Sequence, residues 1–110
     1  MAGPASIAQF RRRLTLEAPT ETPDGAGGVR RTFAAVAQVW GRIDPVGGED
    51  DIRAGALGQS VTHRIALRWR AGVDASRRLR LGTRLFLIRS VWDPDERRRR
   101  LVCLCEEVKP

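Results

Sequence analysis

The sequence predicts an all-β protein: a small antiparallel β-barrel or sandwich with a long loop insertion between the second and third strands. Three observations support this. Several segments alternate apolar and polar residues with the period of a β-strand, glycine and proline turns separate them, and no segment has a strong helical pattern. The 110 residues, 42% of them hydrophobic, suffice for one domain with its own core. We expect a flexible N-terminal arm over residues 1–9 and a single β-barrel domain over residues 10–110.

The first part of the chain contains two predicted strands. The segment FRRRLTLEA, which begins at Phe10, places Phe10, Leu14 and Leu16 on one face. Residues 19–29 are predicted to form a long hairpin tip or mobile loop, because proline, Asp-Gly and Gly-Gly disfavour regular structure. Residues 32–44 could form a helix through their alanines, but their β-branched and aromatic end favours a strand.

A long insertion follows over residues 46–60. It starts with acidic residues that would suit a helix N-terminus, and Gly55 and Gly58 would keep any helix short. Long insertions in small domains are commonly functional, so we expect a role for this one.

The second half of the chain predicts the remaining strands. Residues 61–70 alternate most cleanly of all, with His63 on the apolar face. Residues 79–92 are predicted to form a short strand, a glycine break and a longer strand. A turn at residues 93–96 then leads into a last strand over residues 98–108.

The charge of the chain narrows the class of partner. Its net charge is +7 and its pI about 11.3, carried almost entirely by arginine, with Lys109 as the only lysine. Such a charge favours polyanions or acidic protein surfaces without choosing between them. We find no secretion signal and no apolar run of the roughly 18 residues that span a bilayer. We therefore expect a protein made in a cytosol, with reduced cysteines and no membrane partner.

Several motifs that suggest chemistry have simpler explanations. Residues 93–100 are predicted to be a solvated or interface hairpin rather than a nucleic-acid site, because their arginines alternate in direction and have acidic neighbours. Cys103 and Cys105 are predicted core thiols, since a disulfide there would be strained and zinc needs about four ligands. His63 is expected to be packed or at an interface. We expect no catalytic residue, no metal site and no cofactor, and hence no enzyme.

The arginine face of residues 61–70 is a better candidate for a functional surface than these motifs. Arg64, Arg68 and Arg70 lie opposite the apolar face, and Trp69 and Trp92 add apolar bulk. A basic strand face is often only solvated, but tryptophan and arginine together dominate protein interfaces.

A series of motifs occurs in order along the chain: RRRLTLEAP, PDGAGGV, VWGRIDP, VGGEDDIRAGALGQS, THRIALRWR with its AGV turn, VWDPDERRR and CEE. Over residues 10–108 their order and spacing resemble those of the phage head–tail joining proteins, also called head-closure or stopper proteins. This family belongs to tailed phages and phage-like gene transfer agents. The THRI stretch with its AGV turn is the most specific part.

The resemblance implies a non-enzymatic virion protein, made in the cytoplasm of the bacterial host and located in the neck, at the head–tail interface. It implies a homo-oligomeric ring, commonly with roughly twelve subunits, which joins the portal and adaptor to the tail terminator or tail tube protein. The insertion would project into the channel, contact DNA non-specifically and help retain it. The implied channel residues are Glu49, Asp50, Asp51, Ile52, Arg53, Leu57 and Gln59. The candidate inter-subunit or partner interface comprises Arg64, Arg68, Arg70, Trp69, Asp24, Arg97 and Arg98.

An alternative function is a small basic β-barrel module that binds nucleic acid. The net charge of +7 and the arginine face favour it. Such barrels usually stack bases on exposed aromatic side chains, whereas three tryptophans and three phenylalanines would barely fill the core.

Overall fold

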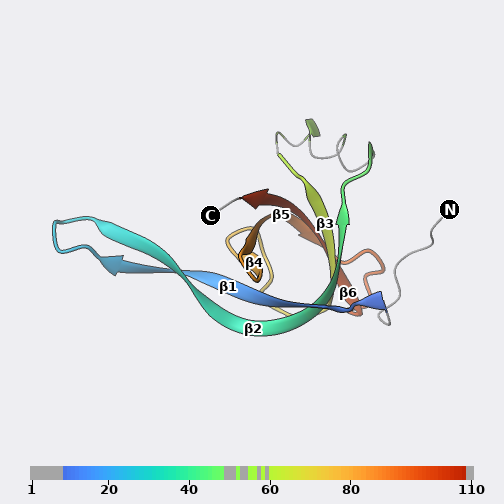
Figure 1. The fold of residues 1–110 in the computed structure, drawn as a ribbon, viewed down its shortest axis with the longest axis horizontal. Coiled ribbons are helices and arrows are strands. Elements are labelled where there is room, and N and C mark those ends of the chain that lie inside the picture. The colour runs from blue at the N-terminus through green and yellow to red at the C-terminus, as the bar shows by residue number, and fades with distance from the viewer. Residues whose placement is uncertain (1–8, 49–51, 53–54, 57, 59, 109–110) are drawn as a thin grey trace.

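The structure is a computed structural model that describes residues 9–48, 52, 55–56, 58 and 60–108 (Figure 1). Six strands close into an antiparallel barrel in the order β1-β2-β3-β6-β5-β4. Their bounds are β1 Arg12–Pro23, β2 Val29–Pro45, β3 His63–Arg68, β4 Arg78–Leu81, β5 Arg84–Trp92 and β6 Arg100–Val108. The predicted all-β antiparallel barrel is therefore confirmed, together with the long gap between the second and third strands.

The core lies inside the barrel, where one face of each strand points. Its fully buried side chains include Leu14 and Leu16 of β1, Ile65 and Leu67 of β3, and Phe86 of β5. Burying an aliphatic or aromatic side chain of this size contributes about 1.5–3 kcal/mol. These residues follow the alternation from which the strands were predicted, so the inward faces of β1 and β3 are confirmed.

The first two strands extend well beyond the barrel as a two-stranded hairpin (Figure 1). Residues 19–29 form the tip of this hairpin, which was one of the two predicted alternatives, but the expected lack of regular structure was wrong, because only residues 24–28 form the turn. Pro19 and Pro23 are tolerated because, among the described residues, no strand pairs with the other edge of β1 there, so no ladder bond requires their missing N–H. Residues 32–44 form part of β2, as predicted.

The other strands match their predictions with shifted ends. β3 is shorter than predicted, because Val61 and Trp69 lie outside it. The glycine break between β4 and β5 is confirmed, with Gly82 at a φ of 62°. β6 begins at Arg100, two residues later than predicted, because Arg98 adopts a φ of 55° in the preceding loop.

Gly41 marks a close approach between strands in the core. A Cβ atom there would lie 2.8 Å from the Ala66 carbonyl oxygen, 2.8 Å from Leu67 Cδ2 and 2.9 Å from Leu14 Cδ1. Glycine therefore lets β2 pass between β1 and β3 where it enters the barrel.

The hairpin gives the molecule an elongated shape, with principal extents of 55 × 29 × 27 Å. Its radius of gyration is 14.8 Å, whereas a compact domain of this size has about 13 Å. Within the described part of the chain, no helix is long and apolar enough to cross a membrane.

Candidate functional site

Two parts of the chain are candidates for function. One is the β1–β2 hairpin, and the other is the segment between β2 and β3 (Figure 1). The predicted channel residues Glu49, Asp50, Asp51, Arg53, Leu57 and Gln59 lie outside the described residues. Ile52 is described, and 74% of it is exposed.

The base of the hairpin is held to the barrel by a buried carboxylate. Glu17 is only 3% exposed, although it lies on the outer face of β1. Its Oε1 is 2.6 Å from Arg78 Nε, and its Oε2 is 3.3 Å from Arg80 Nη2. The Arg78 guanidinium also stacks on the Phe33 ring of β2, 4.0 Å from its centroid. This arrangement, the Glu17 cluster, ties both hairpin strands to β4.

A β-bulge accompanies the Glu17 cluster. Leu16 pairs with Ala37 and Glu17 with Ala35, which leaves Val36 without a partner on β1. An extra residue on one strand bends and twists the pair locally. The bulge and the Glu17 cluster thus lie together at the point where the hairpin leaves the barrel.

The tip of the hairpin is shaped by Asp24, a predicted interface residue. Asp24 Oδ1 accepts hydrogen bonds from the backbone N–H groups of Ala26 (2.7 Å) and Gly28 (3.1 Å). These bonds lower the pKa of Asp24 below its ordinary value. Asp24 therefore has a structural role in the turn over residues 24–28, at the tip of the hairpin.

The ends of the 46–60 segment are joined at the rim of the barrel. The backbone N–H of Val46 donates to the Thr62 carbonyl oxygen (3.2 Å), and the N–H of Thr62 donates to the Cys105 carbonyl oxygen (2.8 Å). The Thr62 hydroxyl accepts a hydrogen bond from the Glu107 N–H (2.7 Å). Val46, at the start of the segment, is thus bonded to Thr62, just after its end, and Thr62 is bonded to β6.

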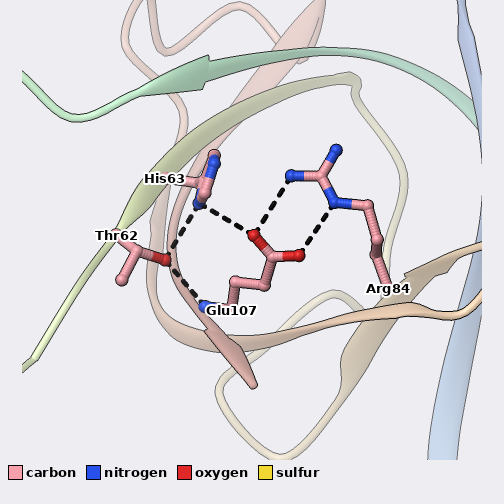
Figure 2. Close-up of polar contacts among 4 residues, drawn as sticks. All are labelled: Thr62, His63, Arg84 and Glu107. Atoms are coloured by element: carbon pink, nitrogen blue, oxygen red, sulfur yellow. Dashed lines mark hydrogen bonds and ion pairs between the residues drawn. The ribbon is translucent and has the colours of Figure 1, made fainter. Parts of the chain in front are cut away.

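Side chains extend this network into a polar cluster, shown in Figure 2. His63 Nδ1 lies 2.9 Å from the Thr62 hydroxyl and 3.9 Å from Glu107 Oε1. Arg84 donates to both Glu107 oxygens, from Nε to Oε2 at 2.8 Å and from Nη2 to Oε1 at 3.1 Å. The hydrogen bond to Glu107 raises the pKa of Arg84.

His63 is also packed against the core. Its ring meets the Phe86 ring edge to face, with centroids 5.3 Å apart. This confirms the prediction of a packed histidine. The polar cluster lies where the 46–60 segment meets β3 and β6.

The predicted arginine face is confirmed in part. Arg64 and Arg68 are exposed on the outer side of β3, whereas Arg70 lies beyond the end of the strand and is half-buried. Trp69 is half-buried, and the guanidinium of Arg98 lies 5.5 Å from its ring. Arg97 is exposed in the loop between β5 and β6. The structure thus brings Trp69 and Arg98 together, but Arg70 is not part of the strand face.

An exposed tryptophan on β2 was missed. Trp40 is 50% exposed, and with Phe10, Arg11 and Arg68 it lines a shallow depression. Its partner on β1 is Arg13, also exposed. The expectation that the core needs every aromatic side chain was therefore wrong. The alternation of Val39 and Gly41 toward the core could have placed Trp40 outside.

The loop between β5 and β6 is held by turn chemistry, as predicted. Asp93 accepts hydrogen bonds from the N–H groups of Asp95 (3.2 Å), Glu96 (3.0 Å) and Arg98 (2.8 Å). Desolvation opposes ionisation of Asp93, but these bonds outweigh it and lower its pKa. Asp95 lies 3.4 Å from Arg100 Nε, so the acidic residues do neutralise part of the arginine run.

The two cysteines are buried free thiols, which confirms the prediction. Burial raises the pKa of Cys103 to about 12 and that of Cys105 well above its ordinary value. Thiols with such high pKa values are poor nucleophiles at neutral pH.

Comparisons with solved structures support the fold and extend the argument to function. The chain is similar to protein SF1141 from Shigella flexneri 2a, with 29% identity, a TM-score of 0.74, and coverage of 94% of this chain and 96% of that one. It is also similar to a chain in the virion of a native gene transfer agent particle, with 27% identity, a TM-score of 0.63, and coverage of 91% and 96%.

The sequence itself matches a family. Among curated proteins, none matches this chain. The model of the phage head completion protein family matches residues 5–108, which is nearly the whole sequence. The chain therefore belongs to the phage head completion protein family, as a non-enzymatic structural component of a phage or gene-transfer-agent virion.

Proposed function

We propose that this chain forms a homo-oligomeric ring at the head–tail interface. The ring joins the portal and adaptor to the tail terminator or tail tube protein, and it helps to retain packaged DNA. The observation that carries the proposal is a closed barrel from which the β1–β2 hairpin projects, with one polar cluster at the base of the hairpin and another where the 46–60 segment joins the barrel. A subunit that contacts neighbours and a channel at once needs contact elements outside its core.

The 46–60 segment is the proposed channel element. Its two ends are joined at the barrel rim by Thr62, and Glu107 and Arg84 brace that rim from β6 and β5. A bidentate arginine–carboxylate pair has a well-defined geometry, which suits an anchor for a segment in a DNA channel. In this proposal the segment contacts DNA without reading its sequence.

The basic outer surface is the proposed contact with other subunits and proteins. Arg64 and Arg68 lie on β3, and Arg97 and Arg98 lie in the loop between β5 and β6. Arginine suits such contacts because its planar fork binds carboxylates at two points. Trp69 beneath Arg98 adds an aromatic surface to the same region.

Electron microscopy of the purified protein, alone and mixed with portal–adaptor complex, tests the proposal. We expect an added ring-shaped layer whose 46–60 segments face the central axis. A matched pair of variants sharpens the test: Arg84→Ala should loosen the channel segment, whereas Arg64→Ala should leave it in place. A protein that stays monomeric and never joins the complex would overturn the proposal.

The exposed Trp40 favours a second candidate function, a basic nucleic-acid-binding barrel. Trp40 lies between Arg13 and Arg68, an arrangement on which a base could stack. In that case the isolated protein would bind DNA with an affinity that falls steeply with salt. Trp40→Ala would then weaken binding, and Trp92→Ala, on the half-buried tryptophan of β5, is the comparison.

A further inference from the structure

We propose that the free edge of β2, over residues 29–40, accepts an extended acidic segment of a different virion protein by strand addition. This inference rests on membership of the virion and deepens the proposed function by naming the chemistry of one partner. It concerns the hairpin and is independent of the channel segment.

The edge is free because β3 covers only one end of β2. β3 pairs with β2 from Gly41 to Pro45, whereas β1 pairs with β2 from Val29 to Gly41. Among the described residues, residues 29–40 of β2 therefore have a strand on one side only. An unpaired strand edge presents a row of backbone N–H and C=O groups, which is a template for another strand.

The two edges of the hairpin are not equivalent. The outer edge of β1 carries Pro19 and Pro23, which have no N–H to donate. Beyond Glu17, the backbone of Pro19, Glu21 and Pro23 faces that edge. Of these three residues, only Glu21 has a backbone N–H to donate. Prolines at an edge discourage strand pairing, so the β1 edge is closed.

The register shows which backbone groups of β2 face outward. Because Pro19 and Pro23 cannot donate, their pairs with Phe33 and Val29 are the non-hydrogen-bonded pairs of the ladder. Such pairs alternate with bonded ones, so the pair of Glu21 with Arg31 is also non-hydrogen-bonded. The hydrogen bond from the Asp24 N–H to the Gly28 carbonyl oxygen (3.1 Å) agrees with this alternation, in which Asp24 and Gly28 are a hydrogen-bonded pair. The N–H groups of Val29, Arg31 and Phe33 therefore point outward, and none is lost to proline.

Charge selects the partner. Arg30 and Arg31 are exposed near the tip, and Arg13 and Arg68 flank Trp40 at the other end of the edge. A second copy is a poor occupant, because its β2 edge carries the same positive charges and its β1 edge lacks donors. Arginines on the edge also keep the free protein from pairing with itself. An acidic extended segment of another protein would pair its carboxylates with these arginines and its backbone with the outward-facing N–H and C=O groups of β2.

Exposed apolar side chains complete the surface. Val29 is 64% exposed and Val36 is 47% exposed, and both lie on the same strand. In strand addition the backbone bonds provide affinity, and alternate side chains provide specificity. A partner segment that alternates acidic and apolar residues matches this surface.

The test compares three variants of the full-length protein in the bacterium that produces the particles. Arg31→Pro removes one outward N–H of β2, Arg31→Ala removes only the charge, and Glu21→Pro removes the remaining donor of the closed β1 edge. All three substitutions leave the inner ladder of the hairpin intact. Thermal unfolding of each purified variant controls for folding.

We expect Arg31→Pro to reduce incorporation of the chain into purified particles by roughly tenfold, as for the loss of one or two interface hydrogen bonds. Arg31→Ala should reduce it less, and Glu21→Pro should leave it unchanged. A second measurement needs no substitution: the amides of Arg31 and Phe33 should exchange hydrogen more slowly in the particle than in the isolated protein.

Several results would overturn the inference. Equal incorporation of Arg31→Pro and the unchanged protein would show that the edge is not used. Equal losses in Arg31→Pro and Arg31→Ala would indicate charge alone, as for a DNA contact. Self-association of the isolated protein that Arg31→Pro abolishes would make the partner a second copy. Electron microscopy of the ring is a separate readout, so failure here leaves the proposed function standing.

Discussion

The barrel and the β1–β2 hairpin share two strands, yet different interactions hold them. Inside the barrel, one face of each strand packs into an apolar core that includes Phe86. Beyond Glu17 the ribbon has no core, and it depends on its ladder, on the Asp24 turn and on the Glu17 cluster. The barrel should therefore respond to changes in side-chain volume, whereas the hairpin should respond to changes in charge and hydrogen bonding.

The largest effect should come from a cavity in the barrel. Phe86 is fully buried, so Phe86→Ala should lower the free energy of unfolding by about 3–5 kcal/mol, measured by chemical denaturation. Val29→Ala on the hairpin is the control, because Val29 is 64% exposed and should change stability by less than about 0.5 kcal/mol. Equal losses would mean that the hairpin tip belongs to the same cooperative core.

Overfilling the barrel should cost somewhat less. Gly41→Ala places a Cβ atom 2.8 Å from the Ala66 carbonyl oxygen, so the strands must move apart. We expect a loss of about 1–3 kcal/mol in the free energy of unfolding. Gly47→Ala is the matched control, since its Cβ atom would meet nothing within 4 Å. If both variants unfold alike, the close approach at Gly41 is not required.

The Glu17 cluster should separate the two regions. Glu17→Gln leaves Arg78 and Arg80 without their carboxylate, but their side chains are 22% and 45% exposed, so solvent offsets part of the loss. We expect about 1–2 kcal/mol in stability and faster amide exchange along the hairpin than in β6. Glu21→Gln, an exposed change on the same strand, should do neither. Unchanged hairpin exchange in Glu17→Gln would show that the cluster does not hold the hairpin.

The smallest effect should appear with acid. The pKa of Asp24 and that of Asp93 both lie below the ordinary value of 3.8. A lowered pKa stabilises the fold fully above the unfolded value, and this contribution is lost as the pH falls through the folded value. The turns should therefore be insensitive to pH from neutrality down to the ordinary carboxyl range and loosen only below it. NMR titration of the two carboxyl groups checks this, and a midpoint above 3.8 at either residue would contradict it.

The barrel could be predicted because its strands and turns are specified by residues only a few positions apart in the sequence. In β3 the large apolar residues recur with the strand period, β5 and β6 carry short continuous apolar runs, and Gly82 and Asp93 mark turns by their own chemistry. Cys103 and Cys105 are buried within such an apolar run. None of these inferences needs to know which strands are neighbours.

The hairpin was less predictable for the opposite reason. The prolines and glycines of residues 19–29 were interpreted as a loop. A sequence pattern does not tell whether the N–H that proline lacks would face a partner strand or an open edge. Trp40 was expected to help fill the core with the other aromatic residues, although Gly41, packed between Leu14 and Leu67, sets which residues of β2 face inward. Both errors arose where the neighbouring strand decides the outcome.

The all-β class, the single core, the reduced thiols and most turns could be predicted from the amino-acid sequence, since strand-forming and turn residues act over a few positions. Three features could be seen only in the folded chain. Glu17 meets Arg78 across 61 residues, the side chains of the Figure 2 cluster converge, and one hairpin edge is open while the other is closed. These features depend on the register between distant strands, which barrel closure sets for all strands together.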